Sequence, residues 1–139
     1  MVTRIVAMLA LCAVLSGSCA GNEYGAISVQ QAYRLIQEMK GNGAFRIIDC
    51  RSPREFAQSR IENAINMDIS NDKFLSAYDG LARENVYLLY CRSGIKSSIV
   101  MKHMKEKGFQ RVYDMSGGIV QWTRQGYPVV TGIENHSEN

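Results

Sequence analysis

Histidine is scarce in this chain, and the scarcity argues against several kinds of active site. The 139 residues contain two histidines, His103 and His136, and neither is close to Cys91 in the sequence. A catalytic set of serine, histidine and aspartate, or of cysteine and histidine, is therefore not supported. The chain also lacks a Cys-x-x-Cys pair and a paired-histidine spacing. The sequence thus predicts neither a metal site nor a cofactor.

An excess of charge of one sign is also lacking. Sixteen Lys and Arg against 13 Asp and Glu give a formal charge of +3, and removal of Arg4 with the leader proposed below leaves 15 against 13, or +2. This small excess favours binding neither to nucleic acid nor to a membrane surface. The length suits one domain with a substantial core, and we expect a monomer.

No apolar run in the sequence is long enough to cross a bilayer, which takes roughly 20 helical residues. Residues 5–15 form an apolar run of 11 residues after Arg4, which is typical of a signal-peptide core. Ser16-Gly17-Ser18-Cys19 follows and resembles a relaxed bacterial lipobox, although an aliphatic residue usually stands where Ser16 does. We expect residues 1–19 to direct export to a bacterial periplasm, with Cys19 lipidated as the only link to the membrane. Simple secretion with a free Cys19 is the alternative.

Strands and helices alternate along the rest of the chain. The patterns predict a tether over residues 20–25, a folded domain over 26–131 and a frayed polar tail over 132–139. Expected strands are residues 26–27, 45–50, 65–69, 86–90 and 109–113, and expected helices include residues 29–39, 72–81 and 95–107. Such alternation without hairpin turns indicates an α/β sandwich around a mostly parallel sheet.

The most informative stretch leads from a buried strand through Cys91 into a helix. Residues 86–90 are apolar without alternation, as in a strand covered on both faces. Cys91 would therefore lie at the carboxyl end of that strand, below the amino end of the helix at 95–107. Ligands of open α/β sheets bind at this edge.

The loop after Cys91 has the residues of an anion cradle. Amide groups entering a helix and the helix dipole favour a thiolate, so we expect Cys91 to act as a nucleophile. The loop supplies cations, hydroxyls and a flexible glycine, and its expected substrate-binding residues are Arg92, Ser93, Gly94, Ile95, Lys96 and Ser97. A buried structural cysteine followed by an ordinary loop is the alternative.

Three stretches resemble the rhodanese family, sulfurtransferases that carry sulfur as a cysteine persulfide. The loop from Cys91 to Ser97 resembles the active-site loop of that family. The other two stretches are Ile47-Ile48-Asp49-Cys50-Arg51 with Glu55-Phe56, and Gly117-Gly118-Ile119-Val120-Gln121-Trp122 with Gly126-Tyr127-Pro128-Val129. The resemblance spans about residues 25–130. It departs from the family at Ser59-Arg60, where Gly-His is usual.

The resemblance implies a rhodanese-like α/β/α sandwich with a central five-stranded sheet. It also implies that Cys91 attacks the outer sulfur of a donor such as thiosulfate and passes the sulfur to an acceptor that the sequence does not identify. Asp49, Arg51 and Glu55 are expected to orient loops rather than to react, Glu55 through a capping box with Ser52.

Other functions of the same loop remain open. Related loops with phosphatase or arsenate-reductase activity have cysteine, five residues, then arginine, whereas here Ser97 holds the arginine position and the cation, Lys96, comes one place early. A non-catalytic persulfide carrier or binding module is the stronger alternative. Cys50 ends the neighbouring strand of the rhodanese topology, which raises the hypothesis that it is a resolving thiol for Cys91.

Overall fold

The computed structural model describes residues 21–70 and 73–132. The predicted leader with Cys19, and nearly all of the polar tail expected over residues 132–139, lie outside the described residues. Among the helices that the structure does describe, none combines the length and the apolar character needed to cross a bilayer.

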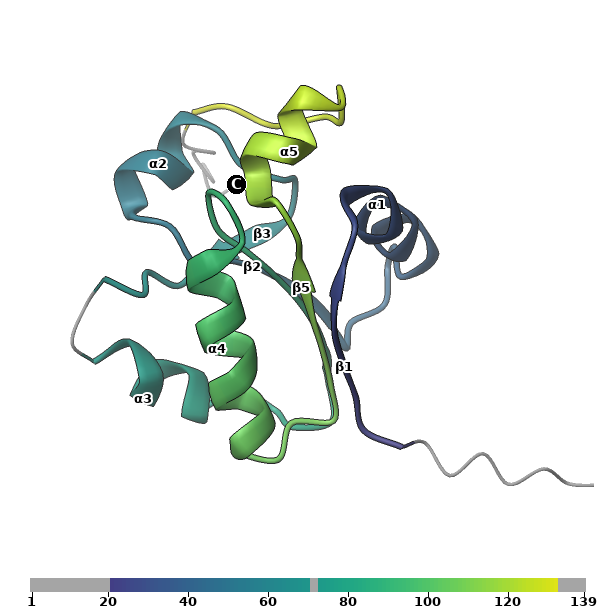
Figure 1. Cartoon of the computed structure of the whole chain (residues 1–139), viewed down its shortest axis with the longest axis vertical. Coiled ribbons are helices and arrows are strands. Elements are labelled where there is room, and N and C mark those ends of the chain that lie inside the picture. The colour runs from purple at the N-terminus through teal and green to yellow at the C-terminus, as the bar shows by residue number, and fades with distance from the viewer. Residues whose placement is uncertain (1–20, 71–72, 133–139) are drawn as a thin grey trace, which may run out of the picture.

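A five-stranded sheet forms the centre of the molecule (Figure 1). Every pair of neighbouring strands is parallel. The spatial order is β1 (Glu23–Ile27), β5 (Arg111–Met115), β4 (Val86–Tyr90), β2 (Phe45–Asp49) and β3 (Ala64–Asn66). The predicted α/β sandwich is confirmed, and the sheet is parallel throughout rather than mostly so.

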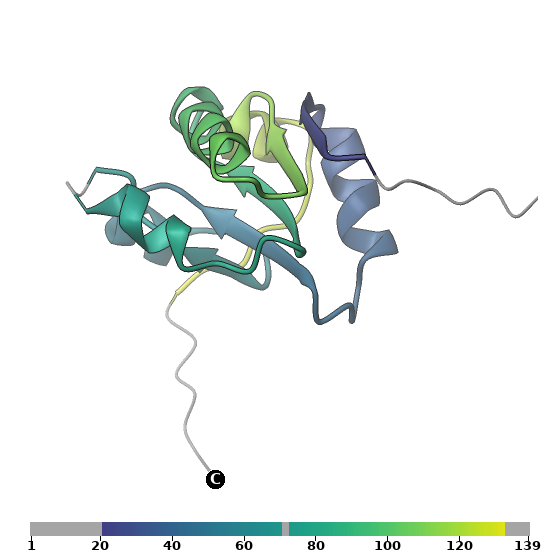
Figure 2. The same ribbon diagram turned by 90° about the horizontal axis from the view of Figure 1, so that it is seen from below.

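Helices cover both faces of the sheet. They are α1 (Val29–Glu38), α2 (Pro53–Gln58), α3 (Phe74–Asp79), α4 (Ile95–Glu106) and α5 (Gly118–Arg124). Figures 1 and 2 show α1 on one side of the sheet and α3 and α4 on the other. All five residues of β4 are buried, because both faces of this central strand lie under helices.

Each face of the sheet has its own hydrophobic core. Fully buried side chains under α3 and α4 are Ile48, Tyr78, Leu89, Val100, Met104, Phe109 and Val112. The core under α1 and α5 includes Val29, Ala32, Leu88, Tyr90, Met115, Ile119 and Trp122. Side chains alternate between these two cores along β4, so Cys91 continues the face of Leu89.

Some boundaries differ from the sequence-based prediction. Residues 23–25, which were expected in the tether, belong to β1, because Glu23 begins this strand and pairs with Arg111. The last strand starts at Arg111 rather than at Phe109, since the Phe109 amide donates to the Met104 carbonyl at the end of α4. The third strand starts at Ala64 and ends at Asn66, before the expected end at residue 69.

Candidate active site

Cys91 lies directly after β4, at the carboxyl edge of the sheet. The loop that follows it lies between α2 and α5 at the top of Figure 1. Cys50 follows the neighbouring strand β2, one residue beyond the paired Asp49 and Tyr90. Both cysteines have free thiols, and Cys91 is only 1% exposed. The predicted nucleophile is therefore at the base of its loop, not at the surface.

Two groups donate hydrogen bonds to the Cys91 sulfur among the described residues. The Gly94 amide lies 3.1 Å from Sγ, and the Ser97 hydroxyl oxygen lies 3.4 Å from it. Gly94 is the N-cap of α4 with φ 95°, and a Cβ there would lie 3.2 Å from the Gly117 amide nitrogen. Glycine is thus required where the loop turns into the helix. The two donors fit an anionic sulfur at this position.

The start of α5 holds the backbone of this loop. The Ile119 amide donates to the Cys91 carbonyl at 2.9 Å, and the Val120 amide donates to the Arg92 carbonyl at 3.2 Å. Gly118 permits this approach, because a Cβ on it would lie 2.4 Å from both carbonyl oxygens. The sequence shows the Gly117-Gly118 pair, but its contact with the Cys91 loop becomes visible only in the structure.

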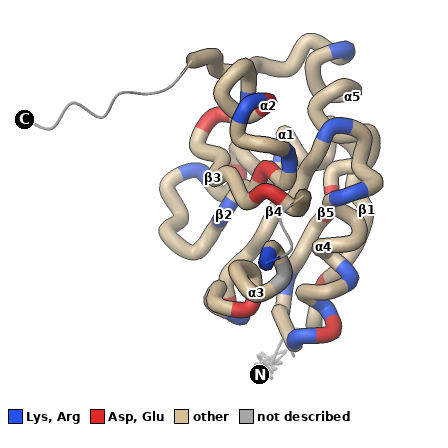
Figure 3. The backbone as a smooth tube through the Cα atoms, turned by 90° about the vertical axis from the view of Figure 1, so that its left-hand side faces the viewer, with Lys and Arg blue, Asp and Glu red and all other residues tan. Residues whose placement is uncertain are grey.

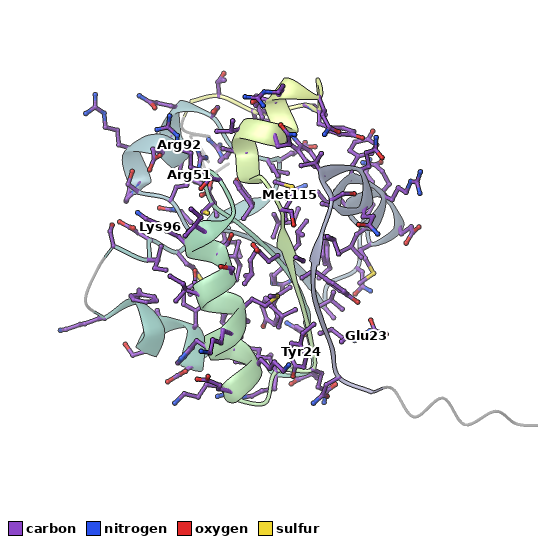
Figure 4. The ribbon with its side chains drawn as sticks, in the orientation of Figure 1. Glu23, Tyr24, Arg51, Arg92, Lys96 and Met115 are labelled. Atoms are coloured by element: carbon purple, nitrogen blue, oxygen red, sulfur yellow. The ribbon has the colours of Figure 1, made fainter. Side chains whose placement is uncertain are left out.

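The remaining loop side chains are exposed. Arg92, Ser93 and Lys96 face solvent, and Ile95 is 71% exposed. Figure 4 shows Arg92 and Lys96 on the same side of the molecule as Arg51. Of the six loop residues expected to bind substrate, Gly94 and Ser97 contact the sulfur. The other four are exposed, and two of them, Arg92 and Lys96, are positively charged.

Asp49 and Arg51 form a buried ion pair at the end of β2. Arg51 Nη2 lies 2.6 Å from Asp49 Oδ2 and 2.6 Å from the Ser59 carbonyl oxygen, to which it also donates. Burial alone would lower the pKa of Arg51, but the hydrogen bonds and the charge of Asp49 outweigh it and raise the pKa. This pair connects the β2 loop to the end of α2, a geometry suited to orienting loops.

Glu55 completes the capping box that the sequence predicts for α2. Its carboxylate accepts from the Ser52 hydroxyl at 2.8 Å and from the Ser52 amide at 3.2 Å. These bonds, together with the charges of Arg51 and Lys96, lower the pKa of Glu55. Glu55 therefore brings a negative charge near the cations of the loop, and Figure 3 shows acidic and basic residues intermingled between α2 and β4.

The match to known families agrees with this geometry. The model of the rhodanese-like domain matches residues 31–125. The chain belongs to the rhodanese-like domain family.

Several relatives of this rhodanese-like domain have names that describe sulfur transfer. A sulfurtransferase of Allochromatium vinosum is 30% identical over 69% of this chain and 88% of its own length. The thiosulfate sulfurtransferase GlpE of Actinobacillus pleuropneumoniae is 30% identical over 76% of this chain and 92% of its own length. The adenylyltransferase and sulfurtransferase uba4 of Ogataea parapolymorpha is 27% identical, and the match spans 23% of that longer protein.

Solved structures show the same fold. A rhodanese-related protein of Thermoplasma volcanium has a TM-score of 0.65 and 30% identity, covering 77% of this chain and 98% of the other. The polysulfide-sulfur transferase homodimer of Wolinella succinogenes has a TM-score of 0.62 and 26% identity, covering 84% of this chain and 85% of the other.

Asp114 is a residue of this rhodanese-like domain that the sequence analysis missed. It lies in β5, is 3% exposed, and its Oδ1 atom is buried without a hydrogen-bond partner among the described residues. Burial raises the pKa of Asp114, and the nearby Ser97 hydroxyl opposes the rise. It lies two residues after Val112 in β5, so both side chains lie on one face, but the strand expected over residues 109–113 ended one residue too early to include it.

A cavity of about 420 Å³ lies on the face of the sheet under α1 and α5, opposite the face on which Cys91 packs. Its lining includes Tyr33, Phe45 and Trp122, and no residue of the Cys91 loop. We place the candidate active site at the loop rather than in this cavity, because the nucleophile and the donors to its sulfur are at the loop.

Proposed function

We propose that this protein is a sulfurtransferase in which Cys91 takes a sulfane sulfur from a donor such as thiosulfate and passes it to a thiophilic acceptor. The observation that carries the proposal is the Cys91 sulfur, which accepts hydrogen bonds from the Gly94 amide and the Ser97 hydroxyl at the amino end of α4. Those donors stabilise a thiolate and, after transfer, the sulfur bound to it.

The reaction runs in two covalent steps. The Cys91 thiolate attacks the outer sulfur of thiosulfate, a sulfur–sulfur bond forms to Cys91, and the bond to the sulfonate sulfur breaks. Sulfite leaves with the electron pair of that bond, and the persulfide retains one negative charge. A nucleophilic acceptor then attacks the outer sulfur and releases the Cys91 thiolate. Arg92 and Lys96, both exposed beside the loop, balance the charge of the incoming anion.

The composition of the loop supports sulfur transfer over phosphoryl chemistry. A phosphatase loop would hold a tetrahedral oxyanion with a guanidinium at the last position, where Ser97 lies here. Ser97 is instead buried and directs its hydroxyl toward Cys91 Sγ. No bidentate group thus occupies the place that a phosphate requires.

Sulfite release from thiosulfate tests the proposal. The wild type and the Cys50→Ala control should release sulfite in the presence of cyanide as acceptor, and Cys91→Ala should lose the activity by roughly a thousandfold or more. Wild type treated with thiosulfate alone should gain the mass of one sulfur atom on the peptide that contains Cys91. Equal rates for wild type and Cys91→Ala would refute the assignment.

The burial of Cys91 supports a second candidate, a non-catalytic persulfide carrier that does not take sulfur from thiosulfate. At 1% exposure, the sulfur is accessible only if the loop moves or a partner displaces it. A carrier would form the persulfide with inorganic polysulfide but would not release sulfite from thiosulfate. The same mass measurement with both reagents separates the carrier from the enzyme.

We also propose that the protein is exported to a bacterial periplasm and anchored through a lipid on Cys19. The support is the apolar run at residues 5–15 followed by small residues before the cysteine. The full chain expressed in a bacterium should partition into detergent and carry a lipid on Cys19. Cys19→Ser should abolish both properties, whereas Cys12→Ser should retain them; a water-soluble, unmodified wild type would refute the anchor.

A further inference from the structure

Exposed apolar side chains gather beside the Cys91 loop. Of the large apolar side chains that the structure describes, four are exposed, namely Ile65, Ile95, Ile99 and Val120. Three of these belong to the amino-terminal halves of α4 and α5, the two helices whose starts lie against the loop. A single exposed isoleucine is ordinary, but a group of them around one site marks a surface that another molecule covers.

The three side chains border the loop from two helices. Ile95 is 71% exposed and Ile99 is 52% exposed, and residues four apart lie on the same face of a helix. Val120 comes from α5, where its amide donates to the Arg92 carbonyl at 3.2 Å. α5 therefore holds Val120 next to the loop that leads into Ile95. We call Ile95, Ile99 and Val120 the apolar rim.

Two cations lie beside the apolar rim. Arg92 and Lys96 are exposed, and Figure 4 shows both on the side of the molecule where the loop lies. Among the described residues, no ion pair includes either of them. Glu55 is close enough for its charge to interact with Lys96, but one carboxylate leaves an excess of positive charge. This surface therefore complements an acidic partner.

A small substrate does not account for the apolar rim. The donors at Gly94 and Ser97 and the two cations suit an anion such as thiosulfate, which gains nothing from apolar contact. Ile99 lies a helical turn beyond Ile95, outside the loop. Apolar area at this distance from the sulfur is buried only by a larger molecule.

Neither a second copy of this chain nor a membrane suits this surface as well as an acceptor protein does. A twofold contact between two copies would bring the Arg92 and Lys96 side chains of both together, and these like charges would repel. A membrane has no thiol that could take sulfur from Cys91. The apolar rim borders the one loop whose sulfur must meet an acceptor, which favours a protein that carries the accepting thiol.

We propose that the apolar rim and its two cations dock a sulfur-acceptor protein whose thiol is surrounded by apolar and acidic side chains. The proposal rests on the proposed function and deepens it by giving the class of acceptor. The acceptor thiolate attacks the outer sulfur of the Cys91 persulfide, so a sulfur–sulfur bond forms on the acceptor and the bond to Cys91 Sγ breaks. The electron pair of the broken bond returns to Cys91 as a thiolate, and the acceptor leaves as a persulfide.

Model acceptors test the proposal on the full chain. Two peptides of equal length carry a central cysteine, flanked by leucine and glutamate in one and by glycine and lysine in the other, and N-acetylcysteine is the small thiol. Cys91 is loaded with thiosulfate, and mass spectrometry follows the loss of the extra sulfur from the Cys91 peptide. Ile99→Ser is the test variant, because isoleucine and serine have similar helix propensities. Ile65→Ser, at a site 48% exposed on β3, is the matched control.

Transfer to the leucine–glutamate peptide should be about tenfold slower from Ile99→Ser than from wild type, and slower still when Val120→Ser is added. Transfer to the glycine–lysine peptide and to N-acetylcysteine should differ by less than about twofold between the same proteins. Ile65→Ser should match wild type with every acceptor. Because each comparison uses one acceptor with several proteins, the intrinsic reactivity of its thiol cancels.

Four results would overturn the proposal. Wild type and Ile99→Ser could transfer sulfur to the leucine–glutamate peptide at equal rates, or Ile99→Ser could slow every acceptor equally, which would mean that Ile99 acts on the loop. A dimer seen by ultracentrifugation in wild type but not in Ile99→Ser would assign the surface to a second copy. Tighter binding of wild type than of Ile99→Ser to phosphatidylglycerol vesicles would assign it to a membrane.

The loading reagent separates this inference from the proposed function. If thiosulfate leaves no persulfide on Cys91, sulfur transfer from thiosulfate is wrong, and inorganic polysulfide then loads Cys91 for the same comparison of acceptors. If thiosulfate loads Cys91 and the rates do not depend on Ile99, the proposed function stands and the docking surface is wrong. A Cys91 that neither reagent loads would refute both.

Discussion

The chain offers a comparison between two cysteines that occupy equivalent places in neighbouring parallel strands. Cys50 follows β2 and Cys91 follows β4, each one residue beyond the paired Asp49 and Tyr90. Both are almost completely buried and belong to the same hydrophobic core. Their surroundings differ in the groups that face the sulfur.

The Cys91 sulfur accepts hydrogen bonds from two donors, whereas the hydroxyl nearest to Cys50 donates its proton to a backbone carbonyl. The Tyr78 hydroxyl donates to the Met67 carbonyl at 2.9 Å and lies 3.4 Å from Cys50 Sγ. Burial raises the pKa of Cys50 to about 12, although the hydrogen bond with Tyr78 opposes the rise. Little Cys50 thiolate exists at neutral pH, which argues against the hypothesis that Cys50 resolves Cys91. Because the two cysteines hold equivalent positions in the sheet, the loop after Cys91 accounts for the different surroundings of the two thiols.

Alkylation should show the largest contrast between the two sites. At pH 8, a thiol with a pKa near 12 is ionised to about one part in 10⁴, so iodoacetamide should modify Cys91 faster than Cys50 by a factor on the order of 10³. Peptide mass mapping after timed labelling measures both rates in one sample. The Cys91→Ser protein serves as the control. A Cys91 as slow as Cys50 would abolish the distinction and the basis of the proposed function.

Substitution of Gly118 should disrupt the Cys91 loop alone. A Cβ at Gly118 would lie 2.4 Å from the carbonyl oxygens of Cys91 and Arg92, so the loop would have to shift by about an ångström. We expect Gly118→Ala to reduce sulfur transfer at least about a hundredfold and to cost about 3 kcal/mol of folding free energy.

Gly126→Ala is the matched control for Gly118→Ala. Gly126 has φ 79°, but a Cβ there would meet no atom within 4 Å. Its substitution should cost only about 1 kcal/mol for the left-handed backbone and leave activity near wild type. Sulfite release and thermal unfolding measure both variants. Equal losses would mean that backbone strain, rather than the contact with the loop, explains the effect of Gly118.

Much of the fold was accessible from the sequence because the local signals agree with one another. The unbroken apolar run of β4 predicted a central parallel strand, and the capping box expected between Ser52 and Glu55 forms at the start of α2. The start of β5 was misplaced by two residues, since Phe109 is apolar like a strand residue but packs in the core and closes α4. An apolar residue in the sequence indicates that its side chain is buried, but it does not indicate which carbonyl its backbone amide will bond.

The candidate site was only partly accessible, for a different reason. Local pattern identified Cys91 and its loop, because strand, loop and helix are consecutive in the chain. The support that Gly118 gives the loop comes from α5, which meets the loop only after folding. Contacts between segments that are distant in the chain leave no periodic pattern in the sequence.

Removal of the Tyr78 hydroxyl should show that the bonds around Cys50 serve the fold rather than the chemistry. Tyr78→Phe leaves the Met67 carbonyl and Cys50 without this partner in the core. We expect a loss of about 1–3 kcal/mol in the free energy of unfolding, measured in urea, with sulfite release within about twofold of wild type at a temperature where the variant is folded. A large loss of activity with little loss of stability would instead connect Tyr78 to catalysis.

Substitution of Asp114 should have the smallest effect on stability, and the size of that effect should depend on pH. Because burial raises the pKa of Asp114 in the folded state, the folded protein retains a proton that the unfolded chain has lost in the window between the ordinary and the raised pKa. The contribution of this group to stability is therefore complete below the ordinary aspartate pKa and is lost as the pH rises through the raised value. Asp114→Asn, which cannot ionise, should be more stable than wild type at neutral pH by about 1 kcal/mol, and the gain should disappear in acid below the ordinary aspartate value. Urea unfolding of both proteins across this range measures the difference. A gain independent of pH would show that packing, rather than the charge of Asp114, explains the difference in stability, and the charge of Asp114 would then have no part in the surroundings of Cys50.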